Sequence, residues 1–278
     1  MFMEVLTMLN TKQTDLKQYQ ITKSNKLIQK TRYSLTLQEQ KILLYIIQKV
    51  KPADTDFETY TISIKEFCEI SGINYSNGKN YMNVKKAILG LKNKAFWFEL
   101  PDGSEVTMDW IAKAKISKEK STIEVRLDED LKPHLLELKE FFVSYRFYYV
   151  MAMKSQFSVR LYELSKSYGN LGNVTFKIET LKERLDLLPD KFAQWNDLKR
   201  YVIEKAIDEI NLLTDLNVEY EPIKDGRTVT KVKLVMTEKS QAARQESEKQ
   251  IEKRINPRRF KEVEEDLPEV PMFDWLNA

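Results

Sequence analysis

The sequence predicts an α+β fold in which one scheme of helices and strands occurs twice. In residues 35–127 and again in residues 155–236, an amphipathic helix is followed by a short strand, a second helix, a third helix with lysines and a β-hairpin. The third helices share a short core, Val84-Lys-Lys-Ala-Ile88 in the first copy and Ile203-Glu-Lys-Ala-Ile207 in the second. This order is that of a winged-helix domain, so we predict two tandem winged-helix domains related by a pseudo-repeat, with a charged C-terminal tail.

The composition fits two domains with a polar surface. The chain has 278 residues, of which 42% are hydrophobic and 31% are charged. A single cysteine, Cys68, excludes an internal disulfide and is typical of a reducing cytosol, so we expect a cytoplasmic protein. No apolar run approaches the roughly 18 residues that a membrane-spanning helix needs, so no membrane partner is expected.

Charge and turn signals divide the chain into four parts. We predict an N-terminal arm over residues 1–24, an N-terminal winged-helix domain over residues 25–140, a C-terminal winged-helix domain over residues 141–238 and a charged tail over residues 239–278. The polar part of the arm is expected to be loose. The junction around residues 139–149 is too aromatic for a flexible linker, and we expect it to pack against both domains.

The elements of the first domain follow from local signals. Thr36 and Glu39 form a capping box that starts a helix with an apolar stripe. Residues 60–64 alternate as a strand, and residues 81–94 form the third helix. Residues 110–127 form a hairpin with a basic tip, which is the first wing.

The second domain repeats this order. Residues 155–164 form the first helix, residues 174–178 a strand and residues 180–187 a second helix. The longest helix is predicted from Phe192 to about Thr214. Asp-Gly between two alternating stretches, in Lys224-Asp-Gly-Arg227, is a strong hairpin signal and predicts the second wing.

The long helix of the second domain is the predicted reader of DNA bases, because winged-helix modules place their third helix in the major groove. On a helical wheel centred on Val202, the predicted buried stripe contains Trp195, Leu198, Ala206, Ile210 and Leu213. Arg200 lies opposite that stripe and can form a bidentate contact with guanine, while an Asn or Gln side chain can pair with adenine. The candidates on this helix are Lys191, Gln194, Asn196, Lys199, Arg200 and Tyr201.

The third helix of the first domain carries Lys without Arg, so we expect it to contact phosphates and to be less specific. Its candidates are Lys79, Asn80, Asn83, Lys85 and Lys86, and the wing tips add Lys118, Lys120, Lys224 and Arg227. About ten such contacts would give a log–log salt slope of about −9. An ordinary solvated face is the alternative for any one of these residues.

Motifs for catalysis are absent from the sequence. No Gly-rich loop ends in Lys-Ser or Lys-Thr, so no P-loop is present. The single histidine, His134, is expected on the surface or as a helix cap. Because the chain has only one histidine, metal sites built on paired histidines are excluded. The acid pairs Asp54/Asp56 and Asp128/Asp130 lie in turn-like stretches and are expected to be solvated. We therefore expect no catalytic residue, no metal and no cofactor.

The tail combines opposite charges with apolar side chains. Residues 239–261 hold eight Lys/Arg and three Glu, whereas residues 262–278 hold six acids and no base. Residues 267–276 add Leu, Met, Phe and Trp, which suit docking into a partner's groove. Host replication proteins are candidate partners, and folding back onto the chain's own domain is the alternative.

Several short motifs together resemble one family. They are Leu35-Thr-Leu-Gln-Glu-Gln-Lys-Ile-Leu-Leu44, Arg160-Leu-Tyr-Glu-Leu164, Ala206-Ile-Asp-Glu-Ile-Asn211 and Thr214-Asp-Leu-Asn-Val218. In order and spacing they resemble the iteron-binding plasmid replication initiators of the Rep_3 family, over about residues 25–237. The resemblance implies a protein that binds directly repeated double-stranded DNA at an origin and helps to open it. It also implies an equilibrium between repressing dimers and initiating monomers, with sequence readout mainly in the C-terminal domain.

Other functions stay open at the level of the sequence. A tandem winged-helix transcriptional regulator would need only the dimer, and a metal-dependent DNA-nicking enzyme would use an acid pair such as Asp128/Asp130 with a tyrosine. An adaptor would act through the tail. For the monomer–dimer change, the aromatic segment from Phe141 to Tyr149 is the candidate packing surface.

Overall fold

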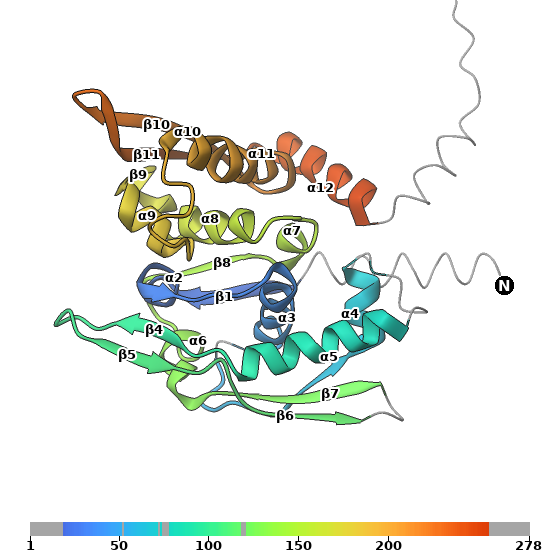
Figure 1. Ribbon diagram of the computed structural model, residues 1–278. Coiled ribbons are helices and arrows are strands. Elements are labelled where there is room, and N and C mark those ends of the chain that lie inside the picture. The colour runs from blue at the N-terminus through green and yellow to red at the C-terminus, as the bar shows by residue number, and fades with distance from the viewer. Residues whose placement is uncertain (1–18, 52, 72, 74–77, 118–120, 256–278) are drawn as a thin grey trace, which may run out of the picture.

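The first half of the chain folds as a winged helix with an additional hairpin (Figure 1). The computed structural model describes residues 19–51, 53–71, 73, 78–117 and 121–255. The elements of the first half are β1 (Gln20–Ser24), α2 (Asn25–Lys30), β2 (Thr31–Arg32), α3 (Leu37–Ile47), β3 (Tyr60–Ser63), α4 (Ile64–Ile70), α5 (Gly78–Lys92), β4 (Phe96–Glu99), β5 (Glu105–Met108), β6 (Ile111–Ser117), β7 (Thr122–Leu127), η1 (Glu129–Leu131) and α6 (Lys132–Leu135). The predicted capping box is confirmed, because Thr36 Oγ1 accepts from the Glu39 N–H and the Glu39 carboxylate accepts from the Thr36 N–H.

The second half repeats the scheme and adds a terminal helix. Its elements are β8 (Phe142–Arg146), α7 (Phe147–Met151), α8 (Gln156–Ser167), η2 (Gly169–Leu171), β9 (Asn173–Lys177), α9 (Ile178–Arg184), α10 (Trp195–Leu198), η3 (Lys199–Ile203), α11 (Glu204–Leu213), β10 (Leu216–Asp225), β11 (Thr228–Glu238) and α12 (Gln241–Ile255). The basic part of the predicted tail is thus helical as far as residue 255.

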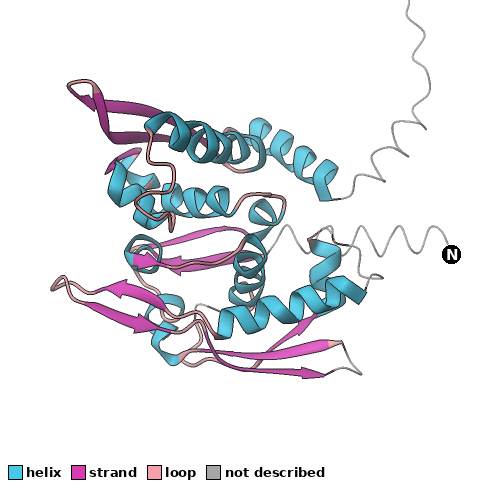
Figure 2. Ribbon diagram, viewed as in Figure 1, coloured by secondary structure: helices cyan, strands magenta, loops and turns pink. Residues whose placement is uncertain are grey.

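Strand pairing confirms the two winged helices. In the first sheet β7 lies between β3 and β6, and in the second sheet β11 lies between β9 and β10. In both, the strand before the second helix therefore pairs with the last strand of the wing (Figure 2). The two copies have opposite orientations in Figure 1: α5 and the α10–α11 helix run in opposite directions, and the wings β6–β7 and β10–β11 point to opposite sides.

The predicted loose arm is wrong for residues 20–24. They form β1, which pairs antiparallel with β8, so that Gln20 lies opposite Arg146 and Ser24 opposite Phe142. Ile21 is fully buried in this strand. The strand lacks a periodic signal of its own, because its backbone hydrogen bonds go to residues about 120 positions away.

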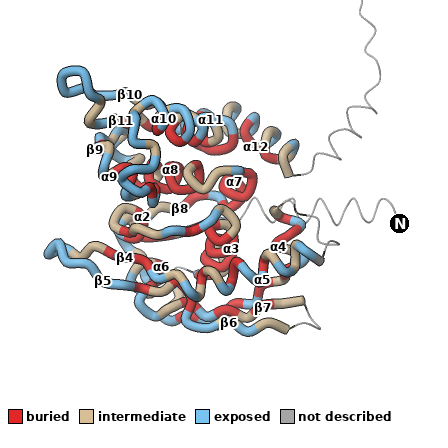
Figure 3. The backbone as a smooth tube through the Cα atoms, viewed as in Figure 1, coloured by how far each residue is buried: buried red, intermediate tan, exposed pale blue. Residues whose placement is uncertain are grey.

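The two halves share one apolar core. The ring of Tyr45 in α3 stacks on Phe147 in α7 at 5.8 Å, and α7 is buried along its whole length (Figure 3). The aromatic junction therefore packs as predicted from Tyr145 onward, whereas Phe141 and Phe142 are exposed. Across the described part of the chain, no helix is long and apolar enough to cross a membrane.

Candidate nucleic-acid interface

The helix predicted to read bases is continuous from Trp195 to Leu213, three residues shorter at its start than expected. Phe192 cannot begin it, because its backbone has a left-handed φ of 50°. Of the predicted stripe, Trp195 is only half-buried and packs at the rim, 6.4 Å from the ring of Tyr220. The buried residues are Leu198, Val202, Ile203, Ala206, Ile207, Ile210 and Leu213.

A single π-turn interrupts this helix at Lys199–Ile203. Its signature is the hydrogen bond from the Glu204 N–H to the Lys199 carbonyl, five residues back. Continuing the buried stripe of α11 backward at 100° per residue would turn Lys199 toward the core and Leu198 away from it. The inserted residue corrects the phase, so that Leu198 is fully buried and Lys199 is half-exposed. A helical wheel with a constant 100° per residue does not include this extra residue. The predicted stripe therefore omitted Ile203 and Ile207, which are buried.

A cluster of rings and cations, exposed except for the partly buried Phe192, surrounds the π-turn. The rings of Phe192 and Tyr201 stack with centroids 6.1 Å apart. Lys191 Nζ lies 5.3 Å from the Phe192 ring, and the Arg200 guanidinium and Lys205 Nζ lie 5.5 Å and 5.3 Å from the Tyr201 ring. Cations over ring faces are held in place without losing their charge, so the cluster presents three oriented positive groups. We call these five residues the ring–cation cluster.

The structure brings most candidates of the second domain to one end of this helix. Lys191, Gln194, Asn196, Arg200 and Tyr201 are all exposed there. Sequence reasoning missed Phe192 and Lys205 as members of the cluster; the spacing of four between Tyr201 and Lys205 was the available signal.

Lys199 differs from its neighbours. Its Nζ lies 3.5 Å from the carboxylate of Glu204, which also accepts a hydrogen bond of 2.9 Å from the Tyr220 hydroxyl. Part of its charge is therefore balanced within the protein, and we expect it to contribute less to DNA binding than Arg200 does.

The second wing exposes Lys224 and Arg227 at its tip. Asp225 pairs with Thr228, so the two turn residues are Gly226 and Arg227, one position later than the Asp-Gly signal suggested. Gly226 has a left-handed φ of 60°, which glycine adopts without strain. A register shift at Ile223/Lys224 accounts for the change.

In the first domain, α5 buries Val84, Ala87, Ile88 and Leu91 and turns its lysines outward. Of its candidates, Lys79, Lys85 and Lys86 are exposed, and Asn80 and Asn83 are partly exposed. Lys118 and Lys120 lie outside the described residues.

Two of the four acids considered for catalysis, and the histidine, have structural partners. Asp56 forms an ion pair of 2.7 Å with Lys132, and the Asp128 carboxylate accepts the Asp130 N–H at the start of η1. His134 is half-buried rather than on the surface: Nδ1 lies 3.0 Å from Ser24 Oγ, and burial lowers its pKa to about 4. Within the described ranges, no group of three or more His, Cys, Asp or Glu side chains is placed to hold a metal ion.

One solved structure shares this arrangement of elements over most of the chain. The crystal structure of the Pi initiator protein in complex with iteron DNA superposes with a TM-score of 0.65 and 19% identity, covering 81% of this chain and 99% of that chain, which shows a common fold. The WH1 domain of MSBI1.176, a replication protein isolated from a multiple sclerosis patient, matches with 20% identity and a TM-score of 0.29, over 36% of this chain and 77% of that chain. Domains 2 and 3 of RctB match with 12% identity and a TM-score of 0.42, over 74% of this chain and 85% of that chain.

Family models identify both halves. The model described as the WH1 domain of an initiator replication protein matches residues 20–166, and the model for the WH2 domain of an initiator Rep protein matches residues 177–235. They follow one another in the order of the two winged helices and confirm the resemblance drawn from the sequence motifs. The chain therefore belongs to the initiator replication protein family, with both of its winged-helix domains present.

Proposed function

We propose that this replication initiator binds directly repeated DNA sites at a plasmid origin, with one winged-helix domain in each of two successive major grooves. The ring–cation cluster at the start of the α10–α11 helix carries the proposal, because it exposes oriented cations where such helices meet base edges. The similar Pi protein was crystallised with iteron DNA, which supports the same class of partner.

In this proposal the second domain mainly contacts bases and the first mainly contacts phosphates. In the second, Arg200 contacts guanine, and Gln194 or Asn196 contacts adenine, while Lys224 and Arg227 bind flanking phosphates. In the first, Lys79, Lys85 and Lys86 hold phosphates, and Asn80 and Asn83 add a weaker base preference through their side-chain amides. Site-specific affinity then depends mainly on the second domain, and salt dependence on both.

Further parts of the proposal concern assembly. A dimer represses the chain's own gene, a monomer binds the origin repeats, and the acidic end of the tail contacts host replication proteins. The location is the cytoplasm, and the protein has no catalytic step of its own. Supercoiled origin plasmid incubated with Mg²⁺ or Mn²⁺ should therefore stay unnicked, and nicking that Asp128→Ala abolishes would contradict this part.

Footprinting on the DNA that flanks the protein's own gene tests the central claim. We expect protection of several short repeats in the same orientation at regular spacing. A single protected inverted repeat would instead favour a transcriptional regulator, because a symmetric dimer reads an inverted site. The absence of any protected sequence at moderate salt would contradict specific binding by either kind of protein.

A further inference from the structure

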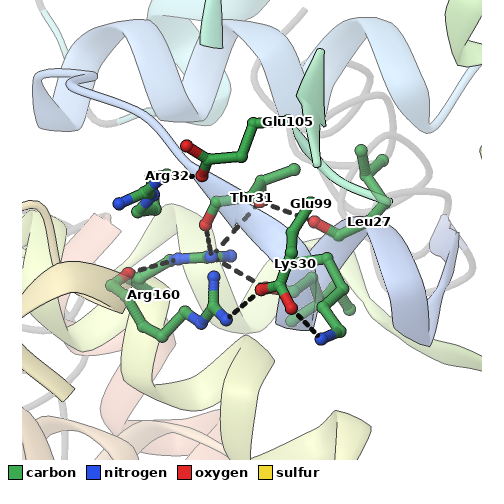
Figure 4. Close-up of polar contacts among 9 residues, drawn as sticks. Leu27, Lys30, Thr31, Arg32, Glu99, Glu105 and Arg160 are labelled. Carbon is green, nitrogen blue, oxygen red and sulfur yellow. Dashed lines mark hydrogen bonds and ion pairs between the residues drawn. The ribbon is translucent and has the colours of Figure 1, made fainter. Parts of the chain in front are cut away.

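A buried arginine joins the two winged-helix domains (Figure 4). Arg160 lies in α8, and its guanidinium has no carboxylate among its hydrogen-bond acceptors in the described structure. Nη2 donates to the carbonyls of Ile28 at 2.7 Å and Thr31 at 2.9 Å, and Nε donates to the carbonyl of Arg184 at 2.9 Å. The first two carbonyls belong to the WH1 half, and the third belongs to the WH2 half.

The acceptors explain how a buried cation is tolerated. Ile28 and Thr31 lie at the C-terminal end of α2, and Arg184 is the last residue of α9. The last carbonyls of a helix lack partners within the helix and carry partial negative charge. One planar guanidinium therefore caps two helices, one from each side of the domain boundary, and its Cζ lies 4.7 Å from the centroid of the Tyr33 ring.

A second contact crosses the same boundary closer to solvent. Glu99, at the end of β4, accepts from Lys30 Nζ at 2.6 Å and from Arg184 Nη2 at 3.0 Å. Lys30 ends α2 and Arg184 ends α9, so Glu99 ties together the two helix ends that Arg160 caps. Hydrogen bonds from both cations hold the pKa of Glu99 below its usual value.

We propose that Arg160 and Glu99 are positioning residues that fix the separation of the two DNA-reading helices, and thereby the base-pair spacing that one chain accepts within a site. The inference rests on the proposed function, since it needs both domains on one duplex. Apolar packing at the boundary is not directional, whereas a guanidinium with three carbonyl acceptors allows one relative placement of α2 and α9. One inserted base pair moves a half-site by ~3.4 Å and by about a tenth of a turn, which a rigid chain cannot follow.

The chain offers a matched control. Glu105 lies directly opposite Glu99 across β4 and β5, and it pairs with Arg32 within the first domain. Glu99→Ala and Glu105→Ala each remove one carboxylate from the same hairpin end and one salt-bridge acceptor, but only the first breaks a contact between domains.

The test measures full-length protein on duplexes that carry the footprinted site with zero, one or two base pairs inserted between its halves. Wild type and Glu105→Ala should lose about 100-fold in affinity on one insertion, as for a badly mismatched site. Glu99→Ala should bind the native site within about threefold of wild type and lose no more than about tenfold on insertion. If one inserted base pair lowered the affinity of Glu99→Ala as much as that of Glu105→Ala, the inference would be overturned.

Arg160→Lys gives a second measurement, since it keeps the positive charge and loses the planar set of guanidinium N–H donors. We expect a similar tolerance of insertions with unchanged base preference in each half-site. If this variant does not fold, Arg184→Ala replaces it, because that change keeps the backbone carbonyl and removes the contact with Glu99. Wild type that binds all spacings equally would overturn the spacing role and leave repeat binding intact, whereas wild type that protects no repeat would reject the proposed function itself.

Discussion

The third helices of the two domains occupy equivalent positions in the same topology, yet they present different side chains. Helix α5 is regular, exposes lysines, and leaves Met82 and Leu89 in solvent. The α10–α11 helix contains a π-turn and gathers arginine, lysine and two rings at one end. Lysine is a point charge suited to phosphate, whereas arginine beside an aromatic ring has a defined orientation suited to a base edge. The winged-helix fold thus fixes where each helix lies, and from the side chains that each presents we infer that α5 mainly binds phosphates and that the α10–α11 helix contacts bases.

The π-turn is the most informative part of this difference. The π-turn keeps Leu198 in the core while the residues around it face solvent. Its removal should therefore change which side chains the α10–α11 helix exposes, and α5 has no corresponding feature. Deleting Lys199 leaves Leu198 four residues before Ile203, which a regular helix can bury.

The deletion of Lys199 should have the largest effect. It changes the position of Arg200 and Tyr201 relative to Gln194 and Asn196, so we expect a loss of about 3 kcal/mol on the repeated site with little change on random duplex. The control is Lys199→Ala, which keeps the π-turn and should weaken all duplexes slightly and equally. Competition binding measures both, with circular dichroism confirming the fold. Equal base preference in the two variants would show that the π-turn has no part in readout.

Arg200→Ala should have the next largest effect. We expect a cost of about 2 kcal/mol on the repeated site and relaxed preference at one base position, because a bidentate contact with guanine is lost. Arg200→Lys should recover non-specific affinity without recovering the preference. Binding to a panel of single-base variants of the site measures this; a uniform loss across the panel would assign Arg200 to phosphate, and the two helices would then differ less than we infer.

Acid should destabilise the first domain through the only histidine in the chain. Burial lowers the pKa of His134 to about 4, with Lys26 adding to the effect. The unfolded chain takes up this proton near its ordinary value of 6.5 and the folded chain does not, so the free energy of unfolding falls as the pH drops from about 6.5 to about 4. We expect His134→Gln to remove about 1–2 kcal/mol of that loss between pH 7 and pH 4.5, measured by urea unfolding. If the free energy of unfolding fell equally with pH in the wild type and in His134→Gln, the acid sensitivity would belong to other groups.

Lys86→Ala in α5 should have the smallest effect. It should weaken all duplexes by less than about 1 kcal/mol and reduce the log–log salt slope by about one, without a change in base preference. Titrations at several salt concentrations measure it. A change of preference at any base would show that Lys86 itself contacts a base rather than a phosphate.

The sequence by itself determined the order of elements and the family. Helices and strands follow from periodicity and from signals within a few residues, such as the capping box at Thr36 and Glu39. The exposed charges of the third helices were also predictable, since residues that lie outside an apolar stripe face solvent. The predicted boundaries at residues 24, 140 and 238 stay predictions.

Tertiary structure decided everything that depends on partners far along the chain. The pairing of β1 with β8 and the capping of α2 and α9 by Arg160 have no signature in any short window. Both satisfy backbone groups whose partners come within reach only once the two halves pack together. In the sequence Arg160 is one of three charged residues of an amphipathic helix, and only the folded chain supplies the carbonyls that make its burial favourable.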